Sequence, residues 1–98
     1  MSFGISKSDL DLITNEIKQH LGSTKNPKLF IYGSRVKGNH REFSDIDILL
    51  KAENYDVLEI SNIDFENLDT PYKIDFVLDK DLFEGYREEI ESHMVLIE

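Results

Sequence analysis

Hydrophobic and polar positions near the start of the chain predict a helix followed by a short strand. Apolar side chains recur at the spacing of one helix face: Leu10, Ile13, Ile17 and Leu21. Ser8 with Asp11 has the pattern of a capping box, which predicts the helix start, and Gly22 predicts its end. The apolar run 29–32 then predicts a buried strand that stops at Gly33.

Two later segments alternate between apolar and polar residues, which predicts strands with one buried face each. In 45–51, one face carries Ile46, Ile48 and Leu50, and the other carries Asp45, Asp47 and Leu49. In 72–79, one face carries Tyr72, Ile74, Phe76 and Leu78, and the other carries Lys73, Asp75, Val77 and Asp79. Three aspartates are thus expected opposite the apolar faces.

The remaining segments complete a predicted small α/β (α+β) domain. A helix is expected over 57–68, although Ile63-Asp64-Phe65 interrupts its periodicity. Asp81 with Glu84 is expected to cap a further helix that carries Leu82, Tyr86 and Ile90, and 94–97 is expected as a closing strand. The alternating order predicts one domain over residues 1–98, with helices packed on a small mixed sheet.

Charge is distributed unevenly along the 98 residues, whose formal net charge is −9. The first 52 residues hold eight bases and six acids (+2), whereas the rest hold three bases and fourteen acids (−11). Direct DNA binding is not expected, because binding phosphates requires an excess of Lys and Arg. The acidic part is either a solvated surface or a face that docks a basic protein partner.

Several classes of protein are excluded by composition. The absence of cysteine excludes disulfides, thiolate metal sites and cysteine catalysis. The sequence contains no run of eighteen apolar residues, so no membrane-spanning helix is predicted. No secretory signal is visible at the N-terminus. The expected location is the cytoplasm.

The turn that begins at Gly33 is a candidate anion site. A strand that stops at Gly33-Ser34 and enters a short helix presents backbone N–H groups, and glycine lets a phosphate approach the backbone. The Ser34 hydroxyl can donate to a phosphate oxygen, and Arg35 and Lys37 add positive charge. Taken alone, the Gly-Ser pair is weak evidence for an anion site, because most such pairs after a strand are plain turns.

The aspartates are candidate metal ligands. Asp45 and Asp47 point from one face of their strand, and carboxylate oxygens suit Mg²⁺ or Mn²⁺. If Asp75 lies on a neighbouring strand, the three carboxylates can hold two divalent ions roughly 3.5–4 Å apart. The alternative is three ordinary surface aspartates. The histidines show no ligand spacing and are interpreted as surface or helix-end residues: His20, His40 and His93.

Taken together, these motifs resemble the signature of the DNA polymerase β-like nucleotidyltransferase superfamily. Gly33-Ser34, ten intervening residues, Asp45-Ile46-Asp47 and a distant Asp75 stand in the order and spacing of that signature. The match is closest to the minimal nucleotidyltransferases, whose usual G-S-R-A-R-G is similar to 33–38 here, with Val36 and Lys37 as conservative departures.

The resemblance implies a fold, an activity and a role for each motif residue. Gly33 and Ser34, with Arg35 and Lys37, would bind the triphosphate of ATP, and the three aspartates would be catalytic and metal-binding. Two Mg²⁺ ions, or Mn²⁺ as a substitute, would assist transfer of AMP to a hydroxyl with release of pyrophosphate. Minimal members are similar to antitoxins that modify a tyrosine of a HEPN-domain ribonuclease toxin, which would be the partner here. The alternative is a nucleotide-binding antitoxin that neutralises its partner by contact alone.

Overall fold

A four-stranded mixed sheet forms the centre of the fold, in a computed structural model that describes residues 3–21, 26–41 and 43–97. The strands lie in the order β3-β2-β1-β4 and comprise β1 (Lys28–Tyr32), β2 (Ile46–Lys51), β3 (Ile74–Leu78) and β4 (Val95–Leu96). β2 runs parallel to β3, whereas β1 is antiparallel to both β2 and β4. The predicted α/β class with a mixed sheet is confirmed.

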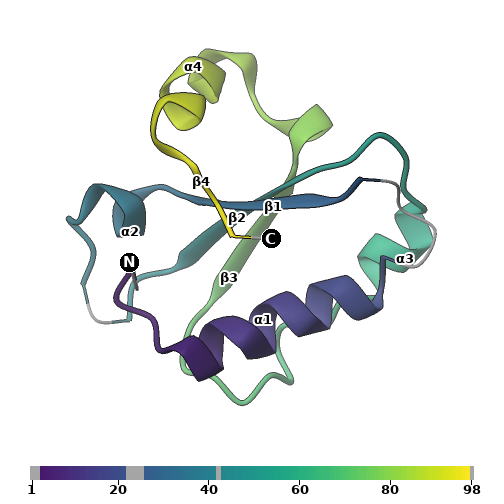
Figure 1. Ribbon diagram of the computed structural model, residues 1–98, viewed down its shortest axis with the longest axis horizontal. Coiled ribbons are helices and arrows are strands. Elements are labelled where there is room, and N and C mark those ends of the chain that lie inside the picture. Colours follow the sequence, from purple (N-terminus) through teal and green to yellow (C-terminus); the bar gives the residue numbers. More distant parts are fainter. Residues whose placement is uncertain (1–2, 22–25, 42, 98) are drawn as a thin grey trace.

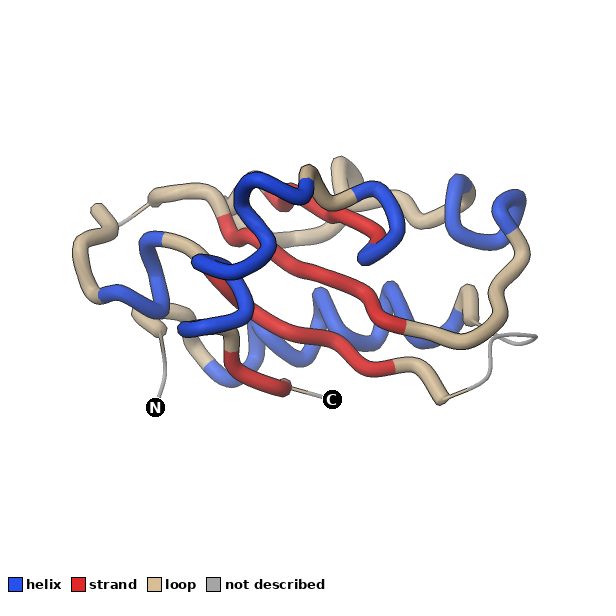
Figure 2. The backbone as a smooth tube through the Cα atoms, turned by 90° about the horizontal axis from the view of Figure 1, so that it is seen from above, coloured by secondary structure: helices blue, strands red, loops and turns tan. Residues whose placement is uncertain are grey.

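Helices cover both faces of this sheet. They are α1 (Lys7–Gln19), α2 (Ser34–Lys37), α3 (Val57–Ser61) and α4 (Glu84–His93), with a 3₁₀ turn, η1 (Asp79–Asp81). α1 runs along one side of the strands and α4 stands on the opposite side (Figure 1). In the view from above, α4 lies in front of the strands and β4 leads away from its end (Figure 2).

The hydrophobic core fills the space between α1 and the sheet. Ile13 and Ile17 of α1 are fully buried, as the helical spacing predicts. They belong to one apolar cluster with Ile31 and Ile48, which are register partners on β1 and β2. Because strand side chains alternate, this packing turns the intervening residues of β2 toward the α4 side.

The residues that cap the starts of α1 and α4 differ from the predicted ones. Ser6, not Ser8, caps α1, and its hydroxyl accepts the N–H of Asp9. Asp81 does not cap α4, since it ends η1 and the cap position is Phe83, which makes no side-chain hydrogen bond. The predicted stop at Gly22 lies outside the described residues.

The helix predicted over 57–68 is wrong beyond its first half. α3 ends at Ser61, and residues 65–71 form turns and bends. Asp64 explains the early end, because its Oδ1 accepts the N–H groups of Glu66 and Asn67 at 3.1 and 3.3 Å. A side chain that satisfies the amides two and three residues ahead stabilises a turn in place of a continued helix.

Acidic side chains of α4 pair with bases from elsewhere in the chain. Glu89 accepts a hydrogen bond from Lys37 at 2.6 Å, and Glu91 accepts one from Lys51 at 3.0 Å. Both lysines belong to the first 52 residues of the sequence. Within α4, Glu84 pairs with Arg87. Part of the acidic excess of the second half is therefore neutralised inside the molecule.

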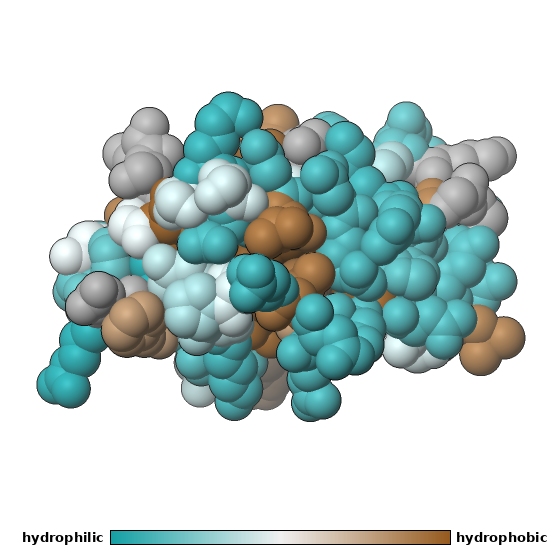
Figure 3. Space-filling model, turned by 90° about the horizontal axis from the view of Figure 1, so that it is seen from below, coloured by the Kyte–Doolittle hydropathy of each residue, from teal (hydrophilic) through white to brown (hydrophobic). Residues whose placement is uncertain are grey.

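The outer surface is mixed in polarity. Seen from below, small hydrophobic patches lie among predominantly hydrophilic side chains (Figure 3). Among the described residues, no helix is both long and apolar enough to span a bilayer.

Candidate active site

Three polar side chains stand in one row across the α4 face of the sheet. Tyr32 of β1 is the register partner of Asp47 on β2, and Asp47 is the register partner of Asp75 on β3. Neighbouring strands of a sheet lie about 4.7–4.9 Å apart, so register partners are in direct reach of each other. The structure therefore brings Asp47 and Asp75 side by side, as the two alternation patterns require once β2 and β3 are neighbours.

The environment of Asp47 disfavours its negative charge. The pKa of Asp47 is raised to about 6, first by burial and then by the charges of Asp75 and Asp45 and a hydrogen bond with the Asp75 side chain. Burial, with Asp47 and Asp75 nearby, also raises the pKa of the Tyr32 hydroxyl. Tyr32 ends the strand that the sequence predicts to be buried, but it is only half-buried and belongs to this row.

Asp45 is placed less centrally than predicted. It is exposed and lies one residue before β2 starts, although its charge reaches Asp47. Within the part of the chain that the structure describes, no three His, Cys, Asp or Glu side chains have the geometry to hold a metal ion together. The structure thus gathers two of the three predicted ligands. Their hard oxygen donors and mutual repulsion fit a divalent cation such as Mg²⁺.

The turn at Gly33 packs its backbone directly against Asp47. Gly33 has φ +83° and ψ −151°, a conformation that side chains rarely adopt. A Cβ at this position would collide with Oδ2 of Asp47. Glycine is therefore required here both by backbone conformation and by space, and the turn lies against the carboxylate pair.

The helix that follows begins as the sequence predicts. The N–H groups of Val36 and Lys37 both donate to the Gly33 carbonyl at 3.1 Å, which makes Ser34 the first residue of α2. Amides at the first positions of a helix have no acceptor within the helix. The Ser34 hydroxyl is thereby placed at the same turn as the backbone groups that would meet a phosphate.

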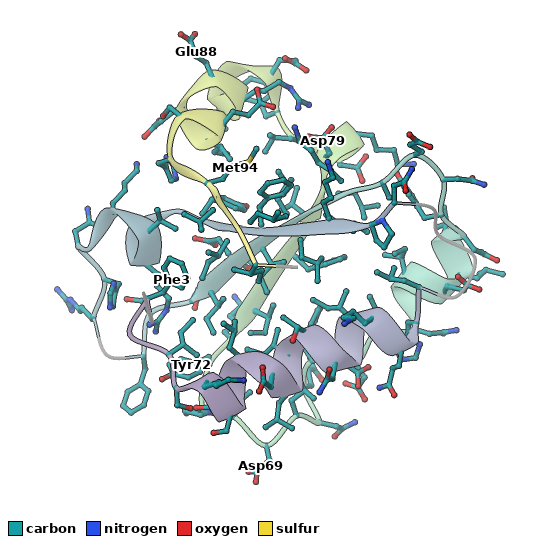
Figure 4. The ribbon with its side chains drawn as sticks, viewed as in Figure 1. Phe3, Asp69, Tyr72, Asp79, Glu88 and Met94 are labelled. Atoms are coloured by element: carbon teal, nitrogen blue, oxygen red, sulfur yellow. The ribbon has the colours of Figure 1, made fainter. Side chains whose placement is uncertain are left out.

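Arg35 does not have the predicted nucleotide-binding position. It is 2 % exposed, and its guanidinium donates to the carbonyls of Phe3 at 2.9 Å and Ser44 at 2.8 Å. It also lies 4.8 Å from the centre of the Tyr72 ring, and Figure 4 shows Phe3 and Tyr72 on the α2 side of the molecule. Arg35 therefore ties the N-terminal segment and the approach to β2 together, which makes it a structural residue.

Lys37 remains at the surface of the turn. Its ammonium group pairs with Glu89 of α4, so a phosphate would have to compete with that carboxylate.

Sequence reasoning missed His93. The Gly33 N–H donates to Nε2 of His93 at 2.9 Å, across 60 positions of sequence. His93 is the last residue of α4, and no local spacing marks it, because the contact exists only after α4 has folded back over the sheet. The prediction that His93 lies at a helix end is confirmed. Its contact with the turn at Gly33 could not be predicted from the sequence.

Comparison with known proteins gives a consistent result. A model of the family described as polymerase beta, nucleotidyltransferase matches residues 15–98. The chain is also similar to the crystal structure of a candidate nucleotidyltransferase from Sulfolobus solfataricus, at 24 % identity and a TM-score of 0.50, over 93 % of this chain and 86 % of that one. At this identity the likeness supports the fold alone. No curated protein matches the chain.

Proposed function

Because the chain belongs to the polymerase beta nucleotidyltransferase family, we propose that it transfers AMP from ATP to a protein hydroxyl and releases pyrophosphate. The proposed acceptor is a tyrosine of a partner HEPN-domain ribonuclease toxin, which the transfer would neutralise. One observation carries the proposal: Asp47 and Asp75 are opposed across two parallel strands, directly beside the Gly33–Ser34 turn.

The turn supplies the binding function. The amides at the start of α2 and the Ser34 hydroxyl would hold the phosphates of ATP, while the missing side chain at Gly33 lets the turn lie directly against Asp47. Placing the triphosphate here brings its reacting phosphate next to Asp47, because the turn and that carboxylate are in contact.

The carboxylates supply the charge on the other side of the phosphate. Asp47 and Asp75 would hold the divalent ions, Mg²⁺ or in its place Mn²⁺, with Asp45 joining from the residue before β2. Bound metal would neutralise the phosphate oxygens and lower the pKa of the acceptor hydroxyl. Asp75 lies on the far side of Asp47 from the turn, and there it would orient the acceptor and receive its proton.

The bond changes in the proposed step follow from these positions. The acceptor oxygen attacks the α-phosphorus of ATP, the bond from that phosphorus to the bridging oxygen breaks, and pyrophosphate leaves. A tyrosine hydroxyl has a reference pKa of about 10, so its proton must be removed during attack. The protein contributes mainly position and electrostatics, as is usual in phosphoryl transfer.

The test is intact mass spectrometry of the partner after incubation with this protein, Mg²⁺ and each nucleoside triphosphate in turn. We expect addition of one nucleotide, mapped to tyrosine, with the wild type and with Asp69→Asn as a matched control on an exposed loop. Asp75→Asn should bind Mg·ATP but fail to transfer. Neutralisation of the toxin without any change in its mass would contradict the proposal and favour inhibition by contact.

A further inference from the structure

The nucleotide-binding turn is held from outside by the end of α4. We infer that His93 is a positioning residue for this turn, an inference that rests on the proposed function. Its ring accepts the Gly33 N–H at 2.9 Å and so fixes the peptide between Tyr32 and Gly33, at the start of the turn. His93 would act on ATP binding through Gly33 without touching the nucleotide.

A second contact shows that α4 and the turn meet along a shared surface. Glu89 lies four residues before His93, on the same face of the helix, and binds Lys37 at the other end of α2. The two contacts therefore hold both ends of α2 against one face of α4. Such a pair defines the orientation of the short helix more closely than either contact alone.

The hydrogen bond also fixes the tautomer of His93. Because the Gly33 N–H donates, Nε2 must carry the lone pair, and the ring proton of a neutral imidazole then lies on Nδ1. Nδ1 is buried and has no hydrogen-bond partner among the described residues. An unpaired buried donor is unfavourable, so this arrangement costs stability in return for the contact with Gly33.

Gly33 needs such support more than other residues of the turn. It adopts a positive φ, makes no side-chain cap, and as a glycine has many other accessible conformations. Without His93, the peptide between Tyr32 and Gly33 would sample several orientations, and only a fraction of molecules would present the turn in its binding form. Apparent affinity falls by that fraction, whereas the bound state still reacts normally.

The experiment compares His93→Leu, which cannot accept a hydrogen bond, with His93→Gln, whose amide oxygen can. His20→Leu is the control, because His20 lies at the end of α1 and binds Glu16. Calorimetry gives the affinity for Mg·ATP, steady-state kinetics gives KM and kcat, and amide NMR follows the Gly33 N–H. We expect His93→Leu to weaken ATP binding and raise KM about tenfold, to leave kcat within about twofold, and to shift the Gly33 resonance.

Each outcome decides the inference. If His93→Gln has wild-type ATP affinity and the wild-type Gly33 resonance, the result supports the positioning role of His93. This holds even if His93→Leu does not fold. Unchanged ATP affinity in folded His93→Leu, or failure of His93→Gln to restore it, overturns the inference. If the wild type binds Mg·ATP through this turn but modifies no partner, the proposed transfer fails while the role of His93 stands. Absence of any ATP binding by the wild type overturns both.

Discussion

The two faces of the sheet are built from the same strands but have opposite requirements. On the α1 side, Ile31, Ile46 and Ile48 have no exposed surface and belong to one continuous core. On the α4 side, Tyr32, Asp47 and Asp75 are half-buried beside a backbone turn. Asp47 and Ile48 are adjacent in sequence, yet one serves the candidate site and the other the stability of the fold. Strand alternation thus separates the two tasks within a single strand.

The largest expected effect comes from Asp47→Asn, which should nearly abolish AMP transfer. It removes a charge from the centre of the site, and losing one preorganised electrostatic group costs ~10²–10³ in rate, more when a metal is lost with it. We expect a loss of about 10³-fold or greater in a radiolabelled ATP assay. Asp69→Asn should retain wild-type activity. Transfer at wild-type rates by Asp47→Asn would remove the enzymatic role of this face.

The substitution Ile48→Ala, at the neighbouring residue, should destabilise the fold through the α1 face of the sheet. Truncation of a fully buried isoleucine costs about 2–5 kcal/mol of unfolding free energy. Urea denaturation measures the loss, with Leu58→Ala, at a side chain 72 % exposed, as the control that should change stability little. The rate of transfer per folded molecule should stay within about threefold. A selective loss of rate without a loss of stability would show that the two faces are coupled.

Stability should depend on pH through Asp47 with the opposite sign from a typical carboxylate. Its folded-state pKa of about 6 lies above the unfolded value of 3.8, so the folded state binds the additional proton. Ionisation of Asp47 therefore lowers the free energy of unfolding as the pH rises from about 4 through about 6. The expected loss is roughly 1–2 kcal/mol after solvent screening. Asp47→Asn should remove this dependence.

The measurement is thermal unfolding of both proteins in chelator at several pH values. The stability of the wild type relative to Asp47→Asn should fall over that pH range. Addition of Mg²⁺ at pH 7 should stabilise the wild type by mass action and the variant much less. A constant difference between the two proteins from pH 4 to pH 7 would contradict the predicted protonation.

The smallest effect is expected at Gly85 in the first turn of α4. A Cβ at this position would lie 2.6 Å from Cε1 of Phe83, whose ring is exposed and packs edge-on against Tyr86. Because an exposed ring can turn aside, Gly85→Ala should stabilise the protein by about 0.5 kcal/mol through helix propensity. Calorimetric unfolding tests this, and destabilisation would show that the Phe83 ring is held in place. Transfer should be unchanged.

The sequence allowed prediction of the strands and of the face on which Asp47 and Asp75 stand, because alternation depends on one strand at a time. It predicted the Gly33–Ser34 turn for the same reason, since a strand, a glycine and a helix start are local features. The pairing of Asp47 with Asp75 required the strand order, which no local pattern contains.

The errors arose where distant groups compete for a side chain. Arg35 was expected to face a phosphate, but the carbonyls of Phe3 and Ser44 bind its guanidinium in the interior. His93 gained its contact from a glycine 60 positions away. Local competition accounts for the misplaced helix start, where Ser6 and Ser8 are both suitable caps and only Ser6 accepts the Asp9 amide.

The parallel pairing of β2 with β3 has a consequence for how this protein tolerates changes in length. The connection over 52–73 includes exposed turns outside the sheet, and lengthening it there should cost little, since loop closure depends only weakly on loop length. Deletion of one residue within β3 is a different event. It would move the side chains of all following strand residues to the opposite face of the sheet. If the deletion precedes Asp75, its carboxylate would then face the apolar core. Variants of this domain can therefore gain residues in the exposed turns of 52–73 at little cost, whereas inside β3 only an even change keeps Asp75 on its face of the sheet.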